Sequence, residues 1–459
     1  MQPFDPAREI AADLETPVSA FLKLAELDPV FLLESAAGGE SIGRYSFIGL
    51  GARHELALEA HELIVDGRLQ PFDGDPLGRL RAWLAEAELP SAELPRGPVG
   101  LVGYIGYEAA GWFERLPAPR PVHFRLPTAA FVVPRAILAF DHLRSTIRLH
   151  PLVDEAEGRA LAAEVARKFR ESVPRAPAVG KSGAPRVSLD QEAFERGVAR
   201  AQEHILAGDL YQIVLSVRFE GETEADPFAV YRALRLLNPS PYLYFLEVAG
   251  AAIVGSSPEV LARLEGRRAL LRPIAGTRPR GATAEEDAAL AAELAADAKE
   301  NAEHTMLVDL ARNDLGRVAA AGTVEVAKLK AIERYSHVMH MVSTVEGVLA
   351  PHCDQFDLFR AAFPAGTVTG APKIRAMEIL HELEDGARGI YAGSVGYFGA
   401  DGSMDQAIAI RTLAFHDGRY ACQAGAGIVA DSAPEREWAE VQHKARVLTR
   451  ALELAGEPL

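Results

Sequence analysis

The sequence predicts an α+β fold in which antiparallel, sandwich-like β-sheets are covered by outer helices. Two kinds of observation predict it. Asp-Gly pairs at positions 66–67, 401–402 and 417–418 separate short strand-like runs, and this dipeptide favours tight β-hairpins. Elsewhere, apolar residues recur at helical spacing. Strands joined by hairpins run antiparallel, so a parallel sheet is not expected.

The helical segments are predicted from spacing and stop signals. Residues 194–205 carry apolar side chains on one helical face, and a glycine follows them. Residues 283–311 are rich in Ala, Glu and Leu and predict a long helix or a helix pair. A last helix is expected to begin near Pro434, capped by Ser432 or Asp431.

The strand predictions rest on apolar runs bounded by turn residues. One strand is expected to begin at Tyr211, after the first helix. Three further runs cover 394–398, 406–415 and 419–423, and Asp-Gly pairs lie within this region. They are predicted to form an antiparallel meander.

The chain of 459 residues is long enough for two or three domains. A stretch rich in Pro, Gly and Ser lies within residues 173–187 and has no periodicity. We interpret 173–187 as a linker between an N-terminal region, 1–172, and a C-terminal region, 188–459.

Composition limits the partners and the compartment. A net charge of −16 and a pI near 5.4 argue against nucleic acid or an anionic membrane as the main partner. Two cysteines do not make a disulfide framework and are typical of a reducing compartment. Neither a signal peptide nor a membrane-length apolar run is apparent. We expect a cytoplasmic protein.

Two Glu-x-x-Glu pairs, Glu300 with Glu303 and Glu437 with Glu440, lie in separate helical segments. Residues three apart share a helix face, and here that face also carries the apolar stripe. Inward carboxylates are unfavourable unless something pairs with them, and an Mg²⁺ ion with all-oxygen ligands would do so. The alternative is that both pairs lie on solvated faces of acidic helices.

Other motifs are less specific. Residues 425–430 look like a dinucleotide fingerprint, but no helix can begin at these glycines. A Gly-Ala-Gly turn could still bring backbone N–H groups close to a carboxylate. Residues 363–373 could form either an anion-binding loop or a structural turn. Neither Cys353 nor Cys422 lies in a nucleophile motif, so no glutaminase site is expected on this chain.

Four long motifs, at 273–280, 303–310, 363–373 and 423–430, together resemble the chorismate-utilising enzymes. Among these, the chain is most similar to the large subunits (component I) of anthranilate synthases, over almost its whole length. The resemblance implies the family's chorismate-utilising fold and a lyase that converts chorismate and ammonia to anthranilate, the first committed step of tryptophan biosynthesis. A separate glutamine amidotransferase subunit, component II, would supply the ammonia.

The resemblance also implies roles for individual residues. Mg²⁺ would be held directly by Glu303 and Glu440, and through water by Glu300 and Glu437. His340 would assist the loss of pyruvate, and Gln212 and Thr367 would belong to the catalytic set. The expected chorismate-binding residues are Gly276, Thr277, Tyr391, Arg411, Gly425, Ala426 and Gly427.

Single positions distinguish activities within the family. Members that add water typically carry a Lys at the position of Gln212, and a Gln cannot act as a base. Many aminodeoxychorismate synthases carry a Lys at the position of Ala275. Both residues favour anthranilate synthesis. The alternatives are an aminodeoxychorismate synthase component I of folate synthesis and a non-catalytic, tryptophan-sensing scaffold.

A second site is implied by the same resemblance. Ser35, Ser240, Pro241 and Tyr242 match the positions of a tryptophan feedback site. Tryptophan would act there as an allosteric inhibitor, by favouring an inactive arrangement of the two regions.

Overall fold

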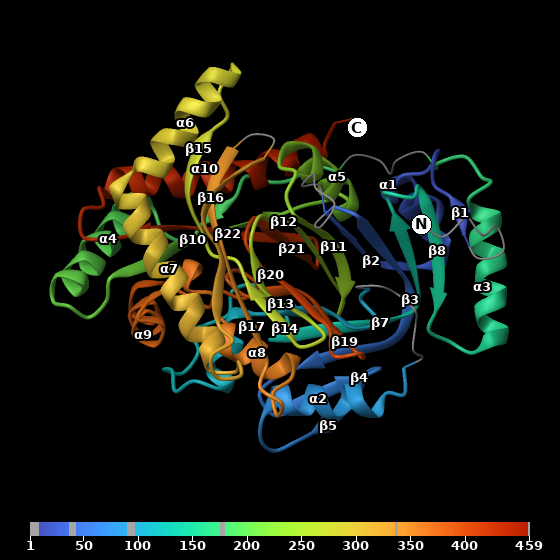
Figure 1. Cartoon of the computed structure of the whole chain (residues 1–459). Helices are drawn as coiled ribbons and strands as arrows, with labels where there is room; N and C mark the ends of the chain where they lie inside the picture. Colours follow the sequence, from blue (N-terminus) through green and yellow to red (C-terminus); the bar gives the residue numbers. More distant parts are fainter. Residues whose placement is uncertain (1–8, 36–42, 90–96, 175–179, 336–337, 458–459) are drawn as a thin grey trace.

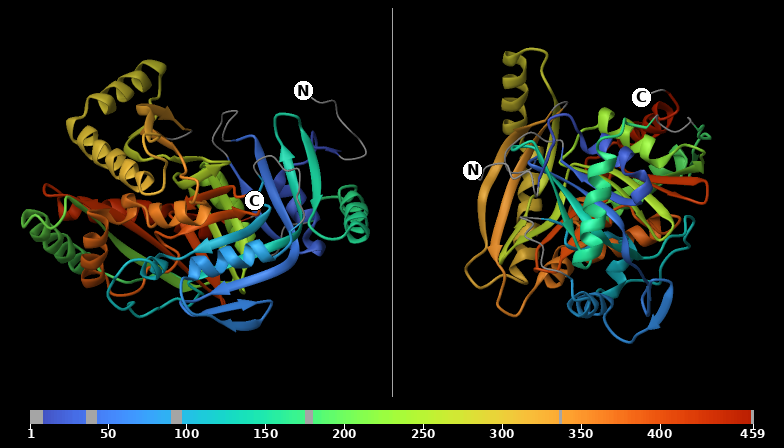
Figure 2. Two further views of the ribbon diagram at one scale, coloured as in Figure 1. Left: turned by 60° about the horizontal axis from the view of Figure 1, so that its bottom comes forward. Right: turned by 90° about the vertical axis from the view of Figure 1, so that its right-hand side faces the viewer.

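The structure is a computed structural model of the chain, and it describes residues 9–35, 43–89, 97–174, 180–335 and 338–457. Within this part of the chain, the paired strands run antiparallel. Helices surround the strands (Figure 1). Both views in Figure 2 show α6 projecting away from the rest of the molecule. The predicted α+β class is confirmed.

The strands divide between the two predicted regions. Those of the N-terminal region are β1 (Ile10–Ala11), β2 (Pro29–Glu34), β3 (Tyr45–Leu58), β4 (Glu62–Val65), β5 (Arg68–Pro71), β6 (Gly100–Ile105), β7 (Ala129–Asp141) and β8 (Thr146–Pro151). The later strands are β9 (Arg186–Val187), β10 (Gln212–Glu222), β11 (Tyr242–Val248), β12 (Ala251–Ser257), β13 (Val260–Glu265), β14 (Arg268–Leu271), β15 (Ile274–Pro279), β16 (Glu325–Arg334), β17 (Val338–Val348), β18 (Gly370–Ala371), β19 (Ser394–Gly399), β20 (Met404–Ile408), β21 (Thr412–His416) and β22 (Arg419–Ile428).

Helices cover the strands on the outside. The α-helices are α1 (Pro17–Lys23), α2 (Pro76–Glu86), α3 (Glu155–Lys168), α4 (Gln191–Leu206), α5 (Pro227–Leu237), α6 (Ala284–Ala296), α7 (Ala298–Gly316), α8 (Gln355–Ala362), α9 (Lys373–Leu383) and α10 (Pro434–Leu454). Short 3₁₀ turns are η1 (Ala25–Leu27), η2 (Tyr107–Trp112) and η3 (Gly366–Val368). None of the helices in the described part of the chain has both the length and the apolar character needed to cross a membrane.

The two predicted regions share one network of strands. β2 pairs with β11, which places Leu32 opposite Phe245, and β6 pairs with β19, which places Val102 opposite Tyr397. Buried side chains from both regions pack in the same core clusters. Residues 175–179 of the expected linker lie outside the described residues, and its last residues form β9, which pairs with β10.

The helices predicted from the sequence are present, but one predicted N-terminal cap is not. α4 begins after Asp190, whose side chain accepts a hydrogen bond from the N–H of Ala193, and Gly208 follows the helix with a φ of 84°. Residues 283–311 form the predicted helix pair, α6 and α7. The expected cap of α10 is wrong: Ala433 occupies the N-cap and no side chain caps the helix.

The meander prediction for residues 394–423 needs a correction. Residues 406–415 are two strands, β20 and β21, because the chain breaks at Arg411, whose φ of 51° is left-handed. β20 pairs with β19 and β13, whereas β21 pairs with β22 and β12. Two hairpins therefore replace the expected three-strand meander, and the break itself carries Arg411.

Candidate active site

The central strand pair, β10 and β22, brings several predicted site residues together. Gly425 lies opposite Ser216, and Gly427 lies opposite Val214. A Cβ added to Gly425 would lie 2.6 Å from the hydroxyl oxygen of Tyr391, and one added to Gly427 would lie 2.6 Å from Nε2 of Gln212. The glycines are therefore needed for close approach by two side chains of the predicted site.

The prediction of a turn at Gly425, Ala426 and Gly427 is wrong. These residues lie inside β22 and pair with β10 over their whole length. Glycine suggests a turn when the sequence is considered alone, but here it is required by packing across a strand. Part of this backbone is engaged in the ladder with β10, so the segment differs from the open anion-binding turn that we expected.

A second strand pair, β15 and β17, positions His340. Thr277 lies opposite His340, and Nδ1 of the imidazole lies 3.1 Å from both the Thr277 hydroxyl oxygen and the Gly276 carbonyl oxygen. A carbonyl only accepts, so Nδ1–H donates to it and Nε2 carries the lone pair of the neutral ring. Burial lowers the pKa of His340, which favours this neutral form.

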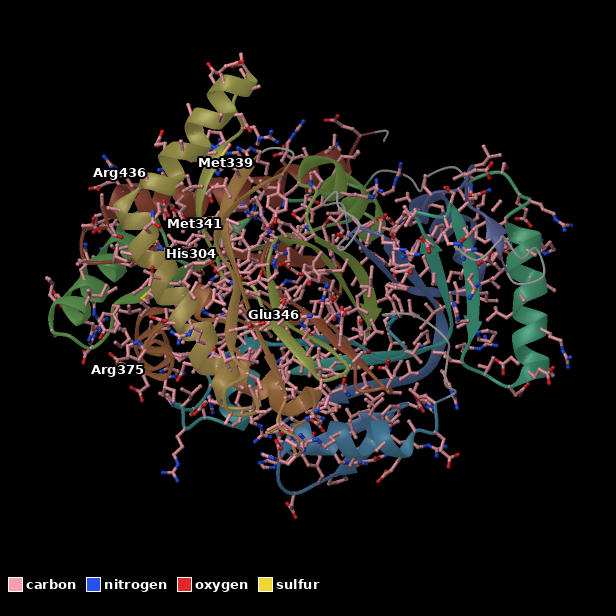
Figure 3. All side chains as sticks on the ribbon, in the orientation of Figure 1. His304, Met339, Met341, Glu346, Arg375 and Arg436 are labelled. Carbon is pink, nitrogen blue, oxygen red and sulfur yellow. The ribbon has the colours of Figure 1, made fainter. Side chains whose placement is uncertain are left out.

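Helix α7 packs along this strand pair. A Cβ added to Gly276, whose φ is 66°, would lie 3.0 Å from a carboxylate oxygen of Glu300. His304, one residue beyond Glu303, is buried, and its Nε2 lies 2.6 Å from Oγ of Ser343 on β17. Figure 3 labels His304, whose contact with Ser343 joins α7 to β17. This contact fixes the face of α7 that carries the glutamates.

The N-terminal turns of α7 and α10 approach each other. Nζ of Lys299 lies 3.3 Å from a carboxylate oxygen of Asp431 and 4.0 Å from one of Glu303. Burial raises the pKa of Glu303, and the nearby carboxylates of Glu300, Asp431 and Glu437 raise it further, although Lys299 opposes them. Carboxylates from two distant segments therefore repel one another in a half-buried space.

The donor chemistry of this space suits Mg²⁺, but the carboxylates are not gathered around one point. Burial, together with Glu440, also raises the pKa of Glu437. Glu440 itself is exposed and pairs with Lys444 at 2.7 Å. Among the residues that the structure describes, no three His, Cys, Asp or Glu side chains lie close enough together to hold a metal ion. Ligation of Mg²⁺ by these four glutamates therefore stays a prediction.

A buried carboxylic acid completes the site and was missed from the sequence. Glu259, in the turn between β12 and β13, accepts a hydrogen bond of 2.9 Å from the hydroxyl of Thr367 in η3. Burial raises its pKa to about 8, so it is neutral at pH 7 and can donate a proton. Its charged neighbours are Arg411 and Lys444. The only sequence signal was an acidic residue between two apolar strand-like runs.

The cations of the site are Arg411 and Lys444. Burial lowers the pKa of Arg411, and its guanidinium makes no salt bridge or hydrogen bond with any residue that the structure describes. Nζ of Lys444 donates a hydrogen bond of 2.9 Å to the Gly425 carbonyl. Lys444 was also missed, although it follows Glu440 by one helical turn. A partly buried guanidinium without an anion is suited to a ligand carboxylate.

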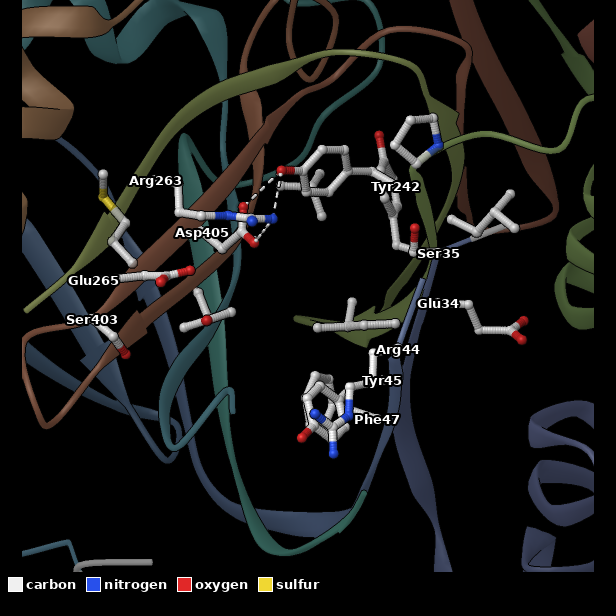
Figure 4. A pocket seen from close by; sticks show the side chains of 18 of the residues that line it. Glu34, Ser35, Arg44, Tyr45, Phe47, Tyr242, Arg263, Glu265, Ser403 and Asp405 are labelled. Carbon is white, nitrogen blue, oxygen red and sulfur yellow. Dashed lines mark hydrogen bonds and ion pairs between the residues drawn. The ribbon is translucent and has the colours of Figure 1, made fainter. Parts of the chain in front are cut away.

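The predicted tryptophan-site residues lie around a separate cavity of about 550 Å³ (Figure 4). Ser35, Pro241 and Tyr242 line it, whereas Ser240 lies behind it, buried and bonded to Asn238. The Ser35 hydroxyl has no hydrogen-bond partner within the described part of the chain. The structure therefore brings the predicted residues together, three of them at the cavity wall.

Two charged residues of this cavity, Arg263 and Asp405, are paired with each other. Nη2 of Arg263 lies 2.7 Å from a carboxylate oxygen of Asp405, and the Tyr242 hydroxyl donates to the same carboxylate at 2.8 Å. Arg263, Asp405 and the cavity-lining Arg44 were not predicted from the sequence. Arg263 and Asp405 come from neighbouring strands, β13 and β20, whose pairing no local pattern indicated.

Comparison with known proteins places this geometry in a family. Residues 28–450 match the chorismate binding enzyme family. Anthranilate synthase component 1 of Thermus thermophilus is 48% identical to this chain, over 97% of this chain and 96% of that protein. The component 1 of Pseudomonas aeruginosa is 46% identical, with 98% of this chain and 95% of that protein covered.

A solved structure agrees with these relatives. The crystal structure of anthranilate synthase component I from Streptococcus pneumoniae has a TM-score of 0.81 and 34% identity, covering 98% of this chain and all of that one. Its similarity extends over the strand network and both helices that carry the glutamates. The chain therefore belongs to the chorismate-binding enzymes and, within them, to the anthranilate synthase component 1 family.

Proposed function

We propose that this chain is the large subunit of an anthranilate synthase, which converts chorismate and ammonia to anthranilate, pyruvate and water. Ammonia would add at C2 of chorismate as the C4 hydroxyl leaves, and the loss of pyruvate would then make the ring aromatic. The family assignment and the chemistry of the site residues both support this reaction.

The substrate is a dianion, and the site supplies cations for it. Arg411 has no anionic partner of its own, and Lys444 lies near it, since both act on Glu259. A guanidinium can hold one carboxylate through two parallel hydrogen bonds. Gly276, Thr277, Tyr391 and the segment Gly425–Gly427 would form the walls that orient the ring and the enolpyruvyl group.

Departure of the C4 hydroxyl requires a proton, and Glu259 would donate it. Its raised pKa keeps it protonated near neutral pH, and the hydroxyl of Thr367 holds its carboxyl group in place. A neutral acid in a buried site is suited to general acid catalysis, which supports this role.

Loss of pyruvate requires removal of the proton at C2. The unprotonated Nε2 of the neutral His340 ring would accept this proton. Mg²⁺, when bound, would supply positive charge at the ring carboxylate of chorismate. Glu303 and Glu440 would hold it directly, and Glu300 and Glu437 through water. Burial and neighbouring carboxylates raise the pKa values of Glu303 and Glu437, and a bound cation would favour their ionised forms, which supports this assignment.

The observation that carries the choice of nucleophile is the position of Gln212. Its amide lies against Gly427 in the middle of the site, and an amide cannot deprotonate water. Ammonia needs no such base to act as a nucleophile. A separate glutamine amidotransferase subunit would release it, because the sequence of this chain contains no recognisable glutaminase motif.

We further propose that the chain acts in the cytoplasm and that tryptophan inhibits it from the cavity at Ser35 and Tyr242. Free Cys353 and Cys422 are consistent with a reducing compartment. The cavity combines apolar walls with paired charges, which suits an aromatic amino acid.

The test is the identity of the product. Purified chain is incubated with chorismate, ammonium and Mg²⁺, and the products are separated and identified by fluorescence and mass. Anthranilate together with pyruvate is expected. Formation of 4-amino-4-deoxychorismate alone would assign the chain to folate synthesis instead. Tryptophan binding without turnover of chorismate would make it a non-catalytic sensor.

A further inference from the structure

A buried ion pair lies behind the substrate-facing walls of the site. Arg388 follows Glu384, the C-cap residue of α9, by four positions, and the exposed fractions of the two side chains are 1% and 7%. Nε and Nη2 of Arg388 donate to the two carboxylate oxygens of Glu384 at 2.8 Å and 2.7 Å. Neither residue belongs to the proposed catalytic set.

The pair joins three segments that carry site residues. Arg388 donates 2.7 Å hydrogen bonds to the carbonyl of Val214 in β10 and to that of Val368 in η3. Val214 lies two residues from Gln212, and Val368 follows Thr367 directly. A single guanidinium thus fixes the distance between the strand that presents Gln212 and the turn that presents Thr367.

Glu384 extends the connection to β22. One of its oxygens accepts hydrogen bonds from the N–H and the hydroxyl of Ser216, at 3.0 Å and 2.6 Å. The same hydroxyl oxygen accepts a 2.8 Å hydrogen bond from the Gln423 side chain, and Ser216 lies opposite Gly425. The strand that presents Gly425 is therefore tied to the same ion pair.

Aromatic rings and two cavities surround the guanidinium. Cavities of about 370 Å³ and about 250 Å³ both have Arg388 in their walls. Its guanidinium carbon lies 4.8 Å from the ring centre of Tyr107 and 5.5 Å from that of Tyr391. Tyr391 is in turn the side chain that meets Gly425. The pair therefore also supports the side chain that closes the predicted chorismate site.

We propose that Glu384 and Arg388 are positioning residues, which hold Gln212, Thr367, Tyr391 and Gly425 at the separations that chorismate requires. This inference rests on the proposed function. A buried ion pair usually contributes little net stability compared with apolar side chains of the same volume, whereas its hydrogen bonds define one arrangement of the groups around it. Reaction rates are sensitive to such an arrangement, because small displacements of reacting groups are costly.

The first test replaces the forked guanidinium by a point charge. In Arg388→Lys, one ammonium cannot reach Glu384, Val214 and Val368 together. We expect kcat/KM for chorismate to fall about 100-fold, with a rise in KM as well as a fall in kcat. Steady-state kinetics with ammonium as nitrogen source measure this effect, and circular dichroism and thermal unfolding report whether the fold is retained.

Two further variants separate positioning from stability. Ser216→Ala keeps the ion pair but removes the hydroxyl that links it to β22, and we expect a fall of about fivefold in kcat/KM for the loss of one hydrogen bond. Arg144→Lys is the matched control, because Arg144 makes a two-pronged ion pair with buried Glu9 far along the sequence from the site. We expect it to lower thermal stability and to leave kcat and KM unchanged.

Wild-type kcat/KM in folded Arg388→Lys would overturn the inference, as would an equal loss in Arg144→Lys. If Arg388→Lys does not fold, Ser216→Ala decides: unchanged kinetics in that variant reject the positioning role. If the wild-type chain forms no anthranilate, the proposed function fails. The chorismate affinity of the same variants, measured by calorimetry, then tests the pair, and equal affinities would reject it.

Discussion

The two ligand sites of this molecule treat their charges in opposite ways. In the cavity that we assign to tryptophan, Arg263 and Asp405 are paired at 2.7 Å, and Tyr242 donates to the same carboxylate. In the active site, Lys444 pairs with Glu440, but Arg411 has no ion-pair partner among the described residues, and the charge of Glu437 adds to the raised pKa of Glu303. We infer that the cavity is preformed, whereas the active site is held in an unfavourable electrostatic state that its ligands relieve.

This difference predicts opposite effects of mutation at the two sites. Removing an unpaired charge from the active site should abolish activity without a loss of stability. Removing one member of a pair at the cavity should lower stability and inhibition while leaving the chemistry intact. Strained catalytic sites that lower stability in exchange for activity follow the same logic.

The largest effect is expected at Arg411. Arg411→Met removes the guanidinium that we assign to a chorismate carboxylate, and kcat/KM should fall about 1,000-fold, as for a lost charge-assisted pair. The melting temperature should stay the same or rise, because no salt bridge is broken and a partly buried charge is removed. Kinetics and thermal unfolding of the same preparation measure both. A clear fall in stability with little loss of activity would reverse the comparison.

The next effect is expected at Glu259. Loss of the general acid in Glu259→Gln should reduce kcat about 100-fold. In the wild type, kcat should fall as the pH rises through about 8, since the acid then loses its proton, and the variant should lack this limb. A pH–rate profile from pH 6 to 10 tests the assignment, and an unchanged alkaline limb in the variant would reject it.

The same residue makes a prediction for stability. Its pKa is raised from 4.5 to about 8, so between these values the native protein holds a proton that the unfolded chain has released. The contribution of Glu259 to stability is therefore complete below pH 4.5 and is lost as the pH rises to about 8. Glu259→Gln should be less sensitive to pH over this window, as measured by urea unfolding at several pH values.

A moderate effect, on stability rather than on catalysis, is expected at the cavity that we assign to tryptophan. Asp405→Asn leaves Arg263 without its carboxylate partner and should lower the free energy of unfolding by about 3 kcal/mol. Inhibition by tryptophan should weaken, while anthranilate formation without tryptophan should stay close to that of the wild type. Urea unfolding and inhibition curves test this expectation. A complete loss of uninhibited activity would show that the cavity and the active site are not separable.

The smallest effect is expected at Ser35. Ser35 lines the cavity, and its buried hydroxyl has no partner in the described structure, so Ser35→Ala should not destabilise the protein. If tryptophan uses this hydroxyl, the inhibition constant should rise about fivefold, as for one neutral hydrogen bond. An unchanged inhibition constant would exclude Ser35 from the binding site.

Much of the local structure could be predicted from the sequence. The hairpin at Asp66 and Gly67, the helix that contains Phe194, and the helix pair at 283–311 all have strong short-range signals, and all form. The break at Arg411 could not be predicted, because arginine has no preference for a left-handed backbone. Local propensity there is overridden by the pairing of β20 and β21 with different partners.

Prediction of the site failed where its parts meet only through long-range pairing. Glu259, Thr367 and Lys444 come from three separate segments, and nothing local indicates that a buried acid, its hydroxyl partner and a cation meet. Gly425 and Gly427 were interpreted as a turn. They are needed because the Tyr391 and Gln212 side chains pack against them, and these contacts are far apart in the sequence. Family resemblance identified most of the other residues, which periodicity alone did not.

The central claim is that Glu300, Glu303, Glu437 and Glu440 hold an Mg²⁺ ion on which catalysis depends. The decisive measurement is the rate of anthranilate formation from chorismate and ammonium, with and without added Mg²⁺, for the wild type and for Glu440→Ala. We predict fluorescence only in the wild type with Mg²⁺, and a normally folded but inactive variant. A full rate after removal of divalent ions, or from Glu440→Ala, would contradict the account.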